Sequence, residues 1–456
     1  MYRLCRYLAA MMALTSAPAF AAALMTERVN VNPTTGLQAD GISYSPVLSG
    51  DGCVVAFVSQ SSTLAPPGYG LTTGSPAQVY AMNRCVIPHT LELVSVTNDG
   101  SAAADNGCSA PNISADGRYV AFVTAATNLP VPGSGQNGAP NGLYVRDRLN
   151  HTTLSPLEAW RPRSQNNGSI GVDGSAALRY MSDDASTFVF DFRSPPAVQQ
   201  NLYIVHYSAG VSTLQPLCAA NDIACLTGTS DYLAISGDGG TVVLQSTYAF
   251  DGGSSNGFYN VYTYNVATAV ATRASLLTNG SAANQSVDPL SDLGISGDGH
   301  EVAFSSGTAS NFPGDINDTL QLKNVPGGAV TLLSATVDGT PEKIGYGIAL
   351  PKVSADGNRV AFTSENQLVP HNYQVGYDAI VADLSLGRLA SACISASGST
   401  GTNGCDGTTL SQDGRFAAFR SNSTNLVPND TNVKPDIFVV ALDPAIDLIF
   451  ATGFEP

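Results

Sequence analysis

Three side chains with carboxylate or amide oxygens lie in the stretch from residue 430 to residue 436, namely Asp430, Asn432 and Asp436. Carboxylate and amide oxygens in a short loop are the ligands that Ca²⁺ favours. The stretch lacks the glycine and the terminal glutamate of an EF-hand, so hydrogen bonding within a turn is the alternative explanation. The pattern predicts a candidate calcium site in a protein that requires no cofactor.

A second candidate site surrounds Trp160, which is the only tryptophan and stands close to Arg161 and Arg163. Tryptophan and arginine are favoured at binding hot spots. A cluster of one aromatic ring and two cations would suit a sugar or a peptide. The alternative is a ring that packs against the neighbouring part of the fold.

The sequence predicts no catalytic residue. Gly253 and Gly257 enclose Ser255 with the spelling of a nucleophile elbow, but no helix follows, and that motif requires a strand-turn-helix context. The histidines are scattered without metal-ligand spacing, at His89, His151, His206, His300 and His371.

A repeated unit must position these side chains. The pattern Ser-x-Asp-Gly, followed by an apolar run that ends in Phe or Leu, recurs about every 60 residues. Its serines are Ser49, Ser114, Ser182, Ser236, Ser296, Ser354 and Ser411. Aspartate stands two residues after every serine, and glycine follows it in six copies, with Ala185 in the third. Because Asp-Gly between apolar runs is a tight-hairpin signal, the seven aspartates are interpreted as turn caps and not as a catalytic ring.

The composition and the repeat together predict the fold. Charged residues make up only 12% of the chain, which contains 45 glycines and 26 prolines. This composition excludes coiled coils and disordered chains and favours a turn-rich all-β protein. Runs such as residues 119–123 are apolar at successive positions, as in strands buried on both faces. Seven units of four antiparallel strands, over residues 24–444, predict a seven-bladed β-propeller.

The two ends of the propeller predict how the ring closes. Residues 26–31 have the pattern of a fourth strand with no blade before it, and the last repeat ends after its third strand, near Leu442. We therefore expect the N-terminal strand to complete the seventh blade, which also removes an exposed sheet edge.

The stretches Ile113-Ser114-Ala115-Asp116-Gly117-Arg118-Tyr119-Val120-Ala121-Phe122 and Leu410-Ser411-Gln412-Asp413-Gly414-Arg415-Phe416-Ala417-Ala418-Phe419 resemble the repeat of TolB-like, WD-related propellers. The resemblance covers nearly the whole chain after residue 23 and implies the propeller fold. It implies little about activity, because scaffolds, receptors and enzymes share that repeat.

Cysteine positions within the repeat predict three disulfides: Cys53 with Cys85, Cys218 with Cys225, and Cys393 with Cys405. Cys108 has the repeat position of Cys405, but Ser95 stands at the position of its partner. Cys108 is therefore expected to be a buried thiol, the alternative being a bond between chains.

The extreme ends have patterns of their own. Residues 1–23 are typical of a signal peptide, with Arg3 and Arg6 before an apolar stretch and a small-x-small cleavage site after it. We therefore expect an exported protein, in the periplasm or outside the cell, with no membrane span. The tail, residues 445–456, is expected to be a strand or arm on the body, or else a sorting or partner signal.

A formal net charge of −16 argues against a nucleic-acid partner. The loops between second and third strands are long, over residues 60–78, 124–142, 364–378 and 421–436. We expect a secreted, non-catalytic binding or scaffold propeller that takes a partner protein, a peptide or a glycan on this long-loop face. The alternative is a lyase or glycosidase acting on polysaccharide, with acids or a metal at the channel mouth.

Overall fold

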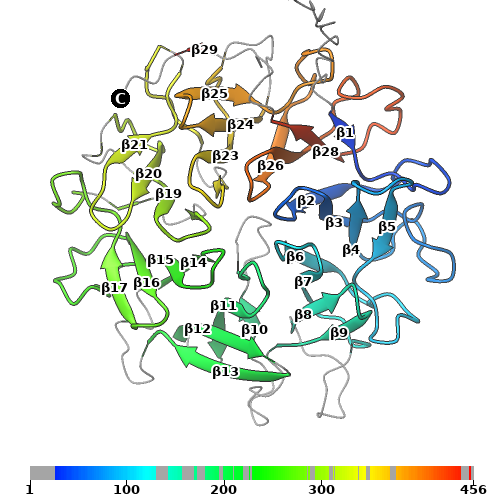
Figure 1. Ribbon diagram of the computed structural model, residues 1–456, viewed down its shortest axis with the longest axis horizontal. Coiled ribbons are helices and arrows are strands. Elements are labelled where there is room, and N and C mark those ends of the chain that lie inside the picture. The colour runs from blue at the N-terminus through cyan, green and yellow to red at the C-terminus, as the bar shows by residue number, and fades with distance from the viewer. Residues whose placement is uncertain are drawn as a thin grey trace, which may run out of the picture.

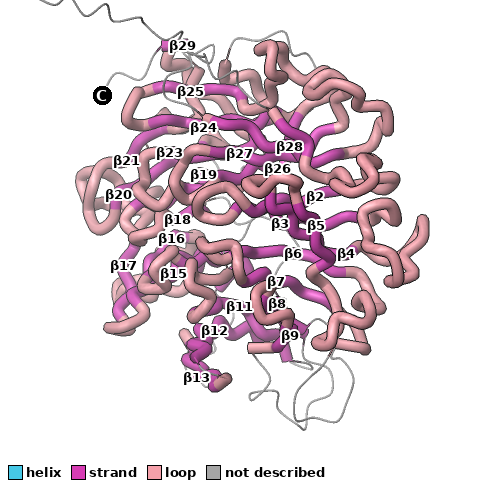
Figure 2. The backbone as a smooth tube through the Cα atoms, turned by 45° about the vertical axis from the view of Figure 1, so that its right-hand side comes forward, coloured by secondary structure: helices cyan, strands magenta, loops and turns pink. Residues whose placement is uncertain are grey.

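The computed structural model is a ring of seven antiparallel sheets around a central channel (Figure 1). It describes residues 26–129, 142–156, 169–171, 180–194, 199–208, 210–218, 225, 229–284, 286–287, 293–307, 312, 314–336, 338–345, 350–369, 376–442 and 451–452. Apart from the helical residue Cys225, the regular structure of these ranges is β-strand, and loops and turns join the strands (Figure 2). The predicted seven-bladed propeller of four-stranded antiparallel blades is confirmed.

The first four blades follow the chain in order, each with its first strand beside the channel. Blade one is β2 (Ser43–Leu48), β3 (Val54–Ser59), β4 (Gln78–Asn83) and β5 (Thr90–Leu93). Blade two is β6 (Cys108–Ile113), β7 (Tyr119–Thr124), β8 (Gly142–Asp147) and β9 (Thr152–Leu154). Blade three is β10 (Ser169–Gly171), β11 (Thr187–Ser194), β12 (Gln199–Ser208) and β13 (Val211–Pro216). Blade four is β14 (Thr229–Ile235), β15 (Thr241–Ser246), β16 (Asn260–Asn265) and β17 (Val270–Arg273).

The last three blades include two departures from this order. Blade five is β18 (Gly294–Ile295), β19 (Glu301–Ser305), β20 (Leu320–Asn324) and β21 (Val330–Leu332). Blade six is β22 (Lys352–Val353), β23 (Arg359–Ser364), β24 (Asp378–Asp383) and β25 (Arg388–Ser391), with β29 (Ala451–Thr452) as a fifth strand. Blade seven is β26 (Cys405–Leu410), β27 (Phe416–Ser421) and β28 (Asp436–Ala441), and β1 (Glu27–Arg28) is its outer strand.

The N-terminal strand completes the seventh blade, as the sequence predicts. Glu27 pairs with Val439 and Arg28 with Phe438 in antiparallel register. The Val29 N–H adds a hydrogen bond of 2.9 Å to the Ile437 carbonyl. The strand pairing of β1 with β28 is shorter than the expected strand over residues 26–31. Side-chain contacts therefore add to the backbone hydrogen bonds that close the ring.

The repeated Ser-x-Asp-Gly sequence forms the turn between the first and second strands of every blade. In all seven turns the serine hydroxyl donates to the aspartate Oδ1 over 2.6 or 2.7 Å. In blade one the Val54 N–H donates back to the Ser49 hydroxyl over 2.9 Å. The residue after the aspartate has a positive φ, which glycine accepts easily and which Ala185 adopts in blade three at φ 56°. The aspartates therefore cap turns.

The core lies between neighbouring blades. The residue eight positions after each repeat serine is buried in every blade, at Phe57, Phe122, Phe190, Leu244, Phe304, Phe362 and Phe419. A buried alanine or valine precedes each of them, such as Ala56 and Ala121, and lets adjacent sheets approach closely. Val58 of blade one and Phe122 of blade two belong to one apolar cluster, so burial holds each blade to the next.

All three predicted disulfides are present: Cys53–Cys85, Cys218–Cys225 and Cys393–Cys405. Cys108 is a buried free cysteine, as expected. Its thiol contacts the hydroxyls of Ser95 and Thr124, and burial raises the pKa of the thiol to about 12 despite these hydrogen bonds. A thiol with so high a pKa is an inert one.

Candidate functional site

The two ends of the channel differ in their connections, and the end at the Asp-Gly turns is surrounded by backbone hydrogen bonds between neighbouring blades. The residue between serine and aspartate of each repeat, or the aspartate itself, bonds through its backbone to the next blade. These hydrogen bonds, N–H donor first, run from Gly50 to Ala115 (2.8 Å), Ala115 to Asp183 (2.8 Å), Asp183 to Gly237 (2.8 Å), Asp238 to Gly297 (3.0 Å), Gly297 to Ala355 (3.2 Å), Ala355 to Gln412 (2.7 Å) and Asp413 to Gly50 (3.0 Å). They form an unbroken ring at the ends of the inner strands.

One side-chain bond crosses this ring. The Gln412 amide of blade seven donates to Asp183 Oδ1 of blade three over 2.6 Å. Beside the ring lies a cavity of about 60 Å³, lined by inner-strand residues that include Val47, Ile113 and Val353. At the turn face the channel is therefore crossed by a side-chain hydrogen bond between blades three and seven.

The long loops are tied to the inter-blade loops that precede them. Asp40, in the loop before β2, accepts hydrogen bonds from the Ser61 hydroxyl and the Ser62 N–H, each over 2.7 Å. Burial alone would raise the pKa of Asp40, but these and neighbouring hydrogen bonds lower it to about 2. The carboxylate is therefore ionised under ordinary conditions and holds the start of the long loop of blade one.

A recurring amide makes the same connection in other blades. The Asn128 side chain donates to the Ala103 carbonyl over 2.7 Å, and the Asn425 side chain donates to the Thr400 carbonyl over 2.8 Å. Both asparagines stand fourteen residues after their repeat serine and precede a buried leucine. That shared position is the sequence signal that could have identified them. The start of each of these long loops is therefore fixed to the inter-blade loop that precedes its blade.

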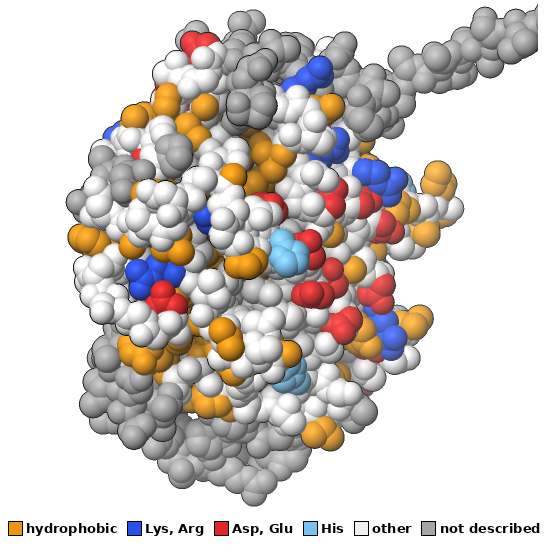
Figure 3. All heavy atoms as spheres, turned by 60° about the vertical axis from the view of Figure 1, so that its left-hand side comes forward, with side chains coloured by type: hydrophobic (Ala, Val, Ile, Leu, Met, Phe, Trp, Pro, Cys, Tyr) orange, Lys and Arg blue, Asp and Glu red, His pale blue; other side chains and the backbone are white. Residues whose placement is uncertain are grey.

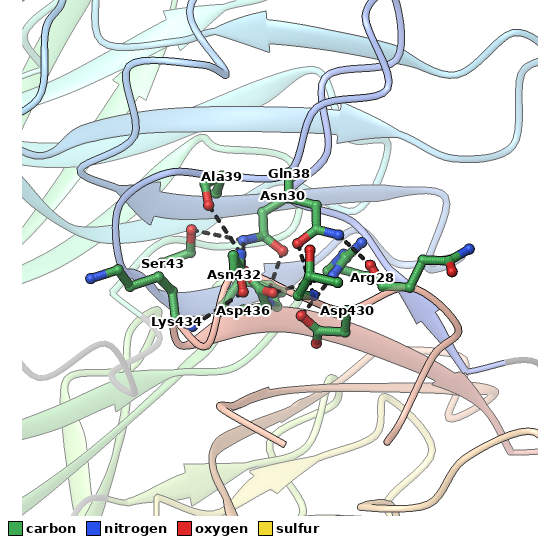
Figure 4. A network of polar contacts seen from close by, with 12 residues as sticks. Arg28, Asn30, Gln38, Ala39, Ser43, Asp430, Asn432, Lys434 and Asp436 are labelled. Carbon is green, nitrogen blue, oxygen red and sulfur yellow. Dashed lines mark hydrogen bonds and ion pairs between the residues drawn. The ribbon is translucent and has the colours of Figure 1, made fainter. Parts of the chain in front are cut away.

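The predicted calcium ligands meet at the seam between blades seven and one (Figure 4). Arg28 Nη1 lies 3.0 Å from Asp430 Oδ1 and 3.5 Å from Asp436 Oδ2, and the Asp436 side chain is fully buried. The Asn30 amide donates to Asp436 Oδ1 over 2.6 Å, and the Asn432 amide donates to the same oxygen over 3.1 Å. We call these five residues the closure network. A guanidinium from the N-terminal strand thus already neutralises part of the charge of the two carboxylates.

Burial dominates the electrostatics of the closure network. It raises the pKa of Asp436 to about 6, although the amides of Asn30 and Asn432 and the charge of Arg28 act in the opposite direction. Burial also raises the pKa of Asp430. Two carboxylates share one cation in a site with little water, so the network is costly to ionise fully.

The closure network holds one exposed apolar side chain in an unusual conformation. Val433 has a φ of 52° and is 69% exposed, and a β-branched residue in the left-handed region is a genuine outlier. Asn432 fixes the backbone on both sides, because its amide donates to the Ala39 carbonyl (3.0 Å) and its Oδ1 accepts the Lys434 N–H (3.1 Å). Strained residues held by their surroundings often mark binding sites.

The inner strand of blade seven, β26, carries an acidic side chain near the long loop between β27 and β28, and this side chain is paired. Arg420 forms a two-point ion pair with Asp406, with Nε 2.6 Å from Oδ1. The described part of the chain contains no group of three or more His, Cys, Asp or Glu side chains that could hold a metal ion. On the face drawn in Figure 3, acidic side chains gather in one region, and the repeat aspartates are exposed at their turns.

The aromatic candidate site cannot be placed, because Trp160, Arg161 and Arg163 lie outside the described residues. The predicted signal segment, residues 1–23, lies outside them too. Within the described ranges we find no helix with the length and apolar character of a membrane span.

Comparisons with known proteins support the fold. No protein-family model matches the sequence, and no curated protein matches it significantly. Among solved structures, TolB from Acinetobacter baumannii is 15% identical, with 67% of this chain and 64% of TolB covered and a TM-score of 0.34. This chain therefore spans less than two thirds of that relative.

Two other solved structures match over most of this chain. Oligogalacturonate lyase from Vibrio parahaemolyticus is 11% identical over 92% of this chain and 98% of its own, with a TM-score of 0.50. A structure described for two prolyl endopeptidases is 16% identical over 91% of this chain and 48% of its own, with a TM-score of 0.50. At such identities the likeness concerns the propeller fold alone.

Proposed function

We propose that this protein is a non-catalytic binding propeller that takes a partner protein, a peptide or a glycan on its long-loop face. The observation that carries the proposal is the difference between the two ends of the channel. The turn end is surrounded by backbone hydrogen bonds between neighbouring blades and is crossed by the bond from Gln412 to Asp183. The other end bears long loops held by side chains such as Asp40 and Asn425, which suits recognition by a rigid surface.

Val433 provides the substitution that tests this face. Val433→Asn removes the exposed apolar contact and tolerates the positive φ, because asparagine enters the left-handed region readily. The matched control is Val270→Asn, since Val270 is 57% exposed at the hairpin between β16 and β17 on the opposite face. A panel of glycans, peptides and envelope proteins is screened with and without calcium. We expect at least tenfold weaker binding of the strongest ligand to the Val433 variant and unchanged binding to the control. Equal affinities would contradict the assignment.

The aromatic cluster remains a proposal for the same surface. If Trp160, Arg161 and Arg163 contact the ligand, Trp160→Ala weakens binding without changing the thermal midpoint, as expected for an exposed hot spot. Equal retention of the ligand by this variant would remove the cluster from the site.

Calcium binding by Asp430, Asn432 and Asp436 also remains a proposal. An ion there would share the carboxylates with Arg28, which lies 3.0 Å from Asp430. Titration calorimetry of the protein with Ca²⁺ tests it, with Asp430→Asn as the comparison. A heat of Ca²⁺ binding that is seen with the parent protein and not with Asp430→Asn supports the site. The absence of a binding heat with both proteins contradicts it.

The alternative function is a polysaccharide lyase or glycosidase. A solved neighbour carries the name oligogalacturonate lyase, and this chain shares its propeller fold. Such an enzyme needs two or more acids, or acids and a metal, at the channel mouth. Incubation with oligogalacturonate and other acidic polysaccharides, followed by product chromatography, distinguishes the two functions. Cleavage that is lost in Asp406→Asn favours the enzyme over the binding protein.

We further propose export to the periplasm or the medium. Three disulfides are present, and disulfides persist mainly in oxidising compartments. Fractionation of the producing cell tests this, with the N-terminal sequence of the recovered protein read by mass spectrometry. A first residue near position 24 supports export, and recovery of reduced protein from the cytoplasm contradicts it.

A further inference from the structure

Blade six is unlike the other blades because a fifth strand lies outside it (Figure 1). The strand β29, Ala451–Thr452, comes from the end of the chain and pairs antiparallel with β25. Thr452 lies opposite Arg388, and Ala451 lies opposite Leu389. The sequence predicts a strand or arm on the body for this segment and does not indicate which blade it joins.

The closure of the ring explains why the chain end has no place in its own blade. The outer edge of β28 is occupied by β1, so the residues after Leu442 cannot form a fourth strand of blade seven. Leu442 packs in an apolar cluster with Val381 and Ala390 of blade six. The Arg359 guanidinium of blade six donates to the Leu442 carbonyl over 3.0 Å. The chain therefore leaves blade seven on the side that faces blade six.

The edge strand β25 also differs from the outer strands of other blades. Three of its four residues are buried, with Leu389 2% and Ala390 4% exposed. The corresponding strands β13 and β17 alternate between exposed and partly buried residues. An apolar edge strand presents unpaired backbone groups that invite another strand, so natural proteins cover such edges.

The sequence of the chain end has the pattern of a strand. Apolar residues stand in succession at Leu448, Ile449, Phe450 and Ala451. A short continuous apolar run is consistent with a strand that is covered on both faces. Extended peptides bind sheet edges through main-chain hydrogen bonds, while alternate side chains provide specificity.

We propose that the outer edge of β25 is a strand-addition site whose occupant is the C-terminal segment of this same chain, residues 445–456. The site recognises an extended peptide with a short apolar run, and the occupant is exchangeable for a free peptide of that sequence. It lies on the outer rim of the ring and is independent of the binding proposed for the long-loop face.

Cross-linking of the full chain tests the site directly. Residues opposite each other in an antiparallel pair have Cβ atoms about 4.5–5.5 Å apart, close enough for a disulfide after small adjustments. The double variant Arg388→Cys with Thr452→Cys should form an intramolecular disulfide in the monomer, detected by peptide mapping. The control, Thr90→Cys with Thr452→Cys, places the first cysteine on the outer strand of blade one and should not cross-link. Absence of the disulfide, disulfide-linked dimers, or equal cross-linking of the control would overturn the proposal.

Competition by a free peptide tests whether the occupant is exchangeable. A synthetic peptide of residues 445–456, in excess during oxidation, should lower the yield of the Arg388–Thr452 cross-link at least fivefold. A scrambled peptide should leave the yield unchanged. If both peptides act alike, the edge has no sequence preference and the site is not a recognition site.

Hydrogen exchange on the unmodified chain covers the case in which the cysteine variant fails to fold. The segment of residues 388–391 should exchange at least tenfold more slowly than residues 270–273, which form the outer strand of blade four. Excess tail peptide should leave this protection in place, because one strand replaces another. Equal exchange rates of the two edges would contradict an occupied β25.

Discussion

At the scale of single residues, the turn of blade three departs from its six counterparts. Ala185 has a φ of 56° where the other turns have glycine. The left-handed conformation costs an alanine about 1–2 kcal/mol, and replacement by glycine removes this cost. A glycine loses more backbone entropy on folding than an alanine, which offsets part of the gain in stability. We expect Ala185→Gly to raise the free energy of unfolding by about 0.5–1 kcal/mol, measured by chemical denaturation.

The opposite substitution serves as the matched control. Gly117 occupies the same position in blade two, and a Cβ there would lie 2.7 Å from Cγ2 of Val54. Gly117→Ala should therefore lower the free energy of unfolding by about 2 kcal/mol, because strain and a steric clash act together. If both variants are destabilised alike, the turn conformation is not what distinguishes Ala185.

The free thiol provides a second prediction at this scale. Ser95 contacts Cys108 and stands at the repeat position of Cys393, whose partner is Cys405. Ser95→Cys should therefore form a fourth disulfide with Cys108 on oxidation. A closed loop of this length contributes about 3 kcal/mol. The lost hydrogen bonds of Ser95 to Gln78 and Val79 reduce that gain to about 1–2 kcal/mol.

Thiol titration with mass spectrometry measures this outcome. In protein that lacks residues 1–23, and with them Cys5, the Ser95 variant should have no free thiol, whereas Ser101→Cys, on the exposed part of the same loop, should have two. A Ser95 variant that keeps two free thiols would mean that the repeat positions of blades two and seven are not equivalent in geometry.

At the scale of elements, the long loop of blade one depends on an ionised Asp40. Its pKa of about 2 lies below the ordinary value of 3.8, because hydrogen bonds from Ser61, Ser62 and Thr63 outweigh burial. Such a group contributes stability that is fully present above pH 4 and is lost as the pH falls through 2. We expect the parent protein to lose about 1 kcal/mol more than Asp40→Asn between pH 5 and pH 2, after allowance for solvent screening. The free energy of unfolding is measured by chemical denaturation at the two pH values. Equal losses of this free energy in the parent protein and in Asp40→Asn would contradict the prediction.

The closure strand gives the second prediction for an element. Asn30 is fully buried and donates to Asp436 and to Ser43, while its Oδ1 accepts the Ile437 N–H over 3.0 Å. Asn30→Ala leaves a buried carboxylate and a buried N–H without these partners, which costs about 3 kcal/mol. Asn358→Ala is the control, because that exposed side chain bonds only Asp356, and it should change stability by less than about 0.5 kcal/mol. Thermal unfolding measures both variants. Equal destabilisation by Asn30→Ala and Asn358→Ala would show that the contacts of the N-terminal strand do not stabilise the closed ring.

At the scale of the whole molecule, local patterns made the fold predictable. The Ser-x-Asp-Gly turn and the apolar run after it are contiguous in sequence, so seven copies in one register define seven blades. The three disulfides follow from repeat positions, and the closure follows from the spare strand at the start of the chain. The tail strand was only half predicted, because its pattern indicates a strand but not which edge it joins.

The candidate site was less predictable because it depends on distant partners. The sequence indicates Asp430 and Asp436 as candidate calcium ligands. It does not indicate their contact with Arg28, because that contact joins residues from opposite ends of the chain. The bond between Gln412 and Asp183 spans a separation of 229 residues and has no local signature. Neither residue type nor spacing indicates that a side-chain hydrogen bond crosses one end of the channel, and the proposal of binding at the other face rests on that feature.

The most direct test of the proposed function masks one face at a time. Val433→Cys and Val270→Cys each place a single exposed thiol on one face, and both are labelled with a bulky polyethylene glycol maleimide. The two conjugates are compared for binding to the strongest ligand of the panel. Masking at residue 433 should abolish binding, and masking at residue 270 should leave it within twofold of the parent protein. Binding that survives at 433 and disappears at 270 would contradict recognition on the long-loop face.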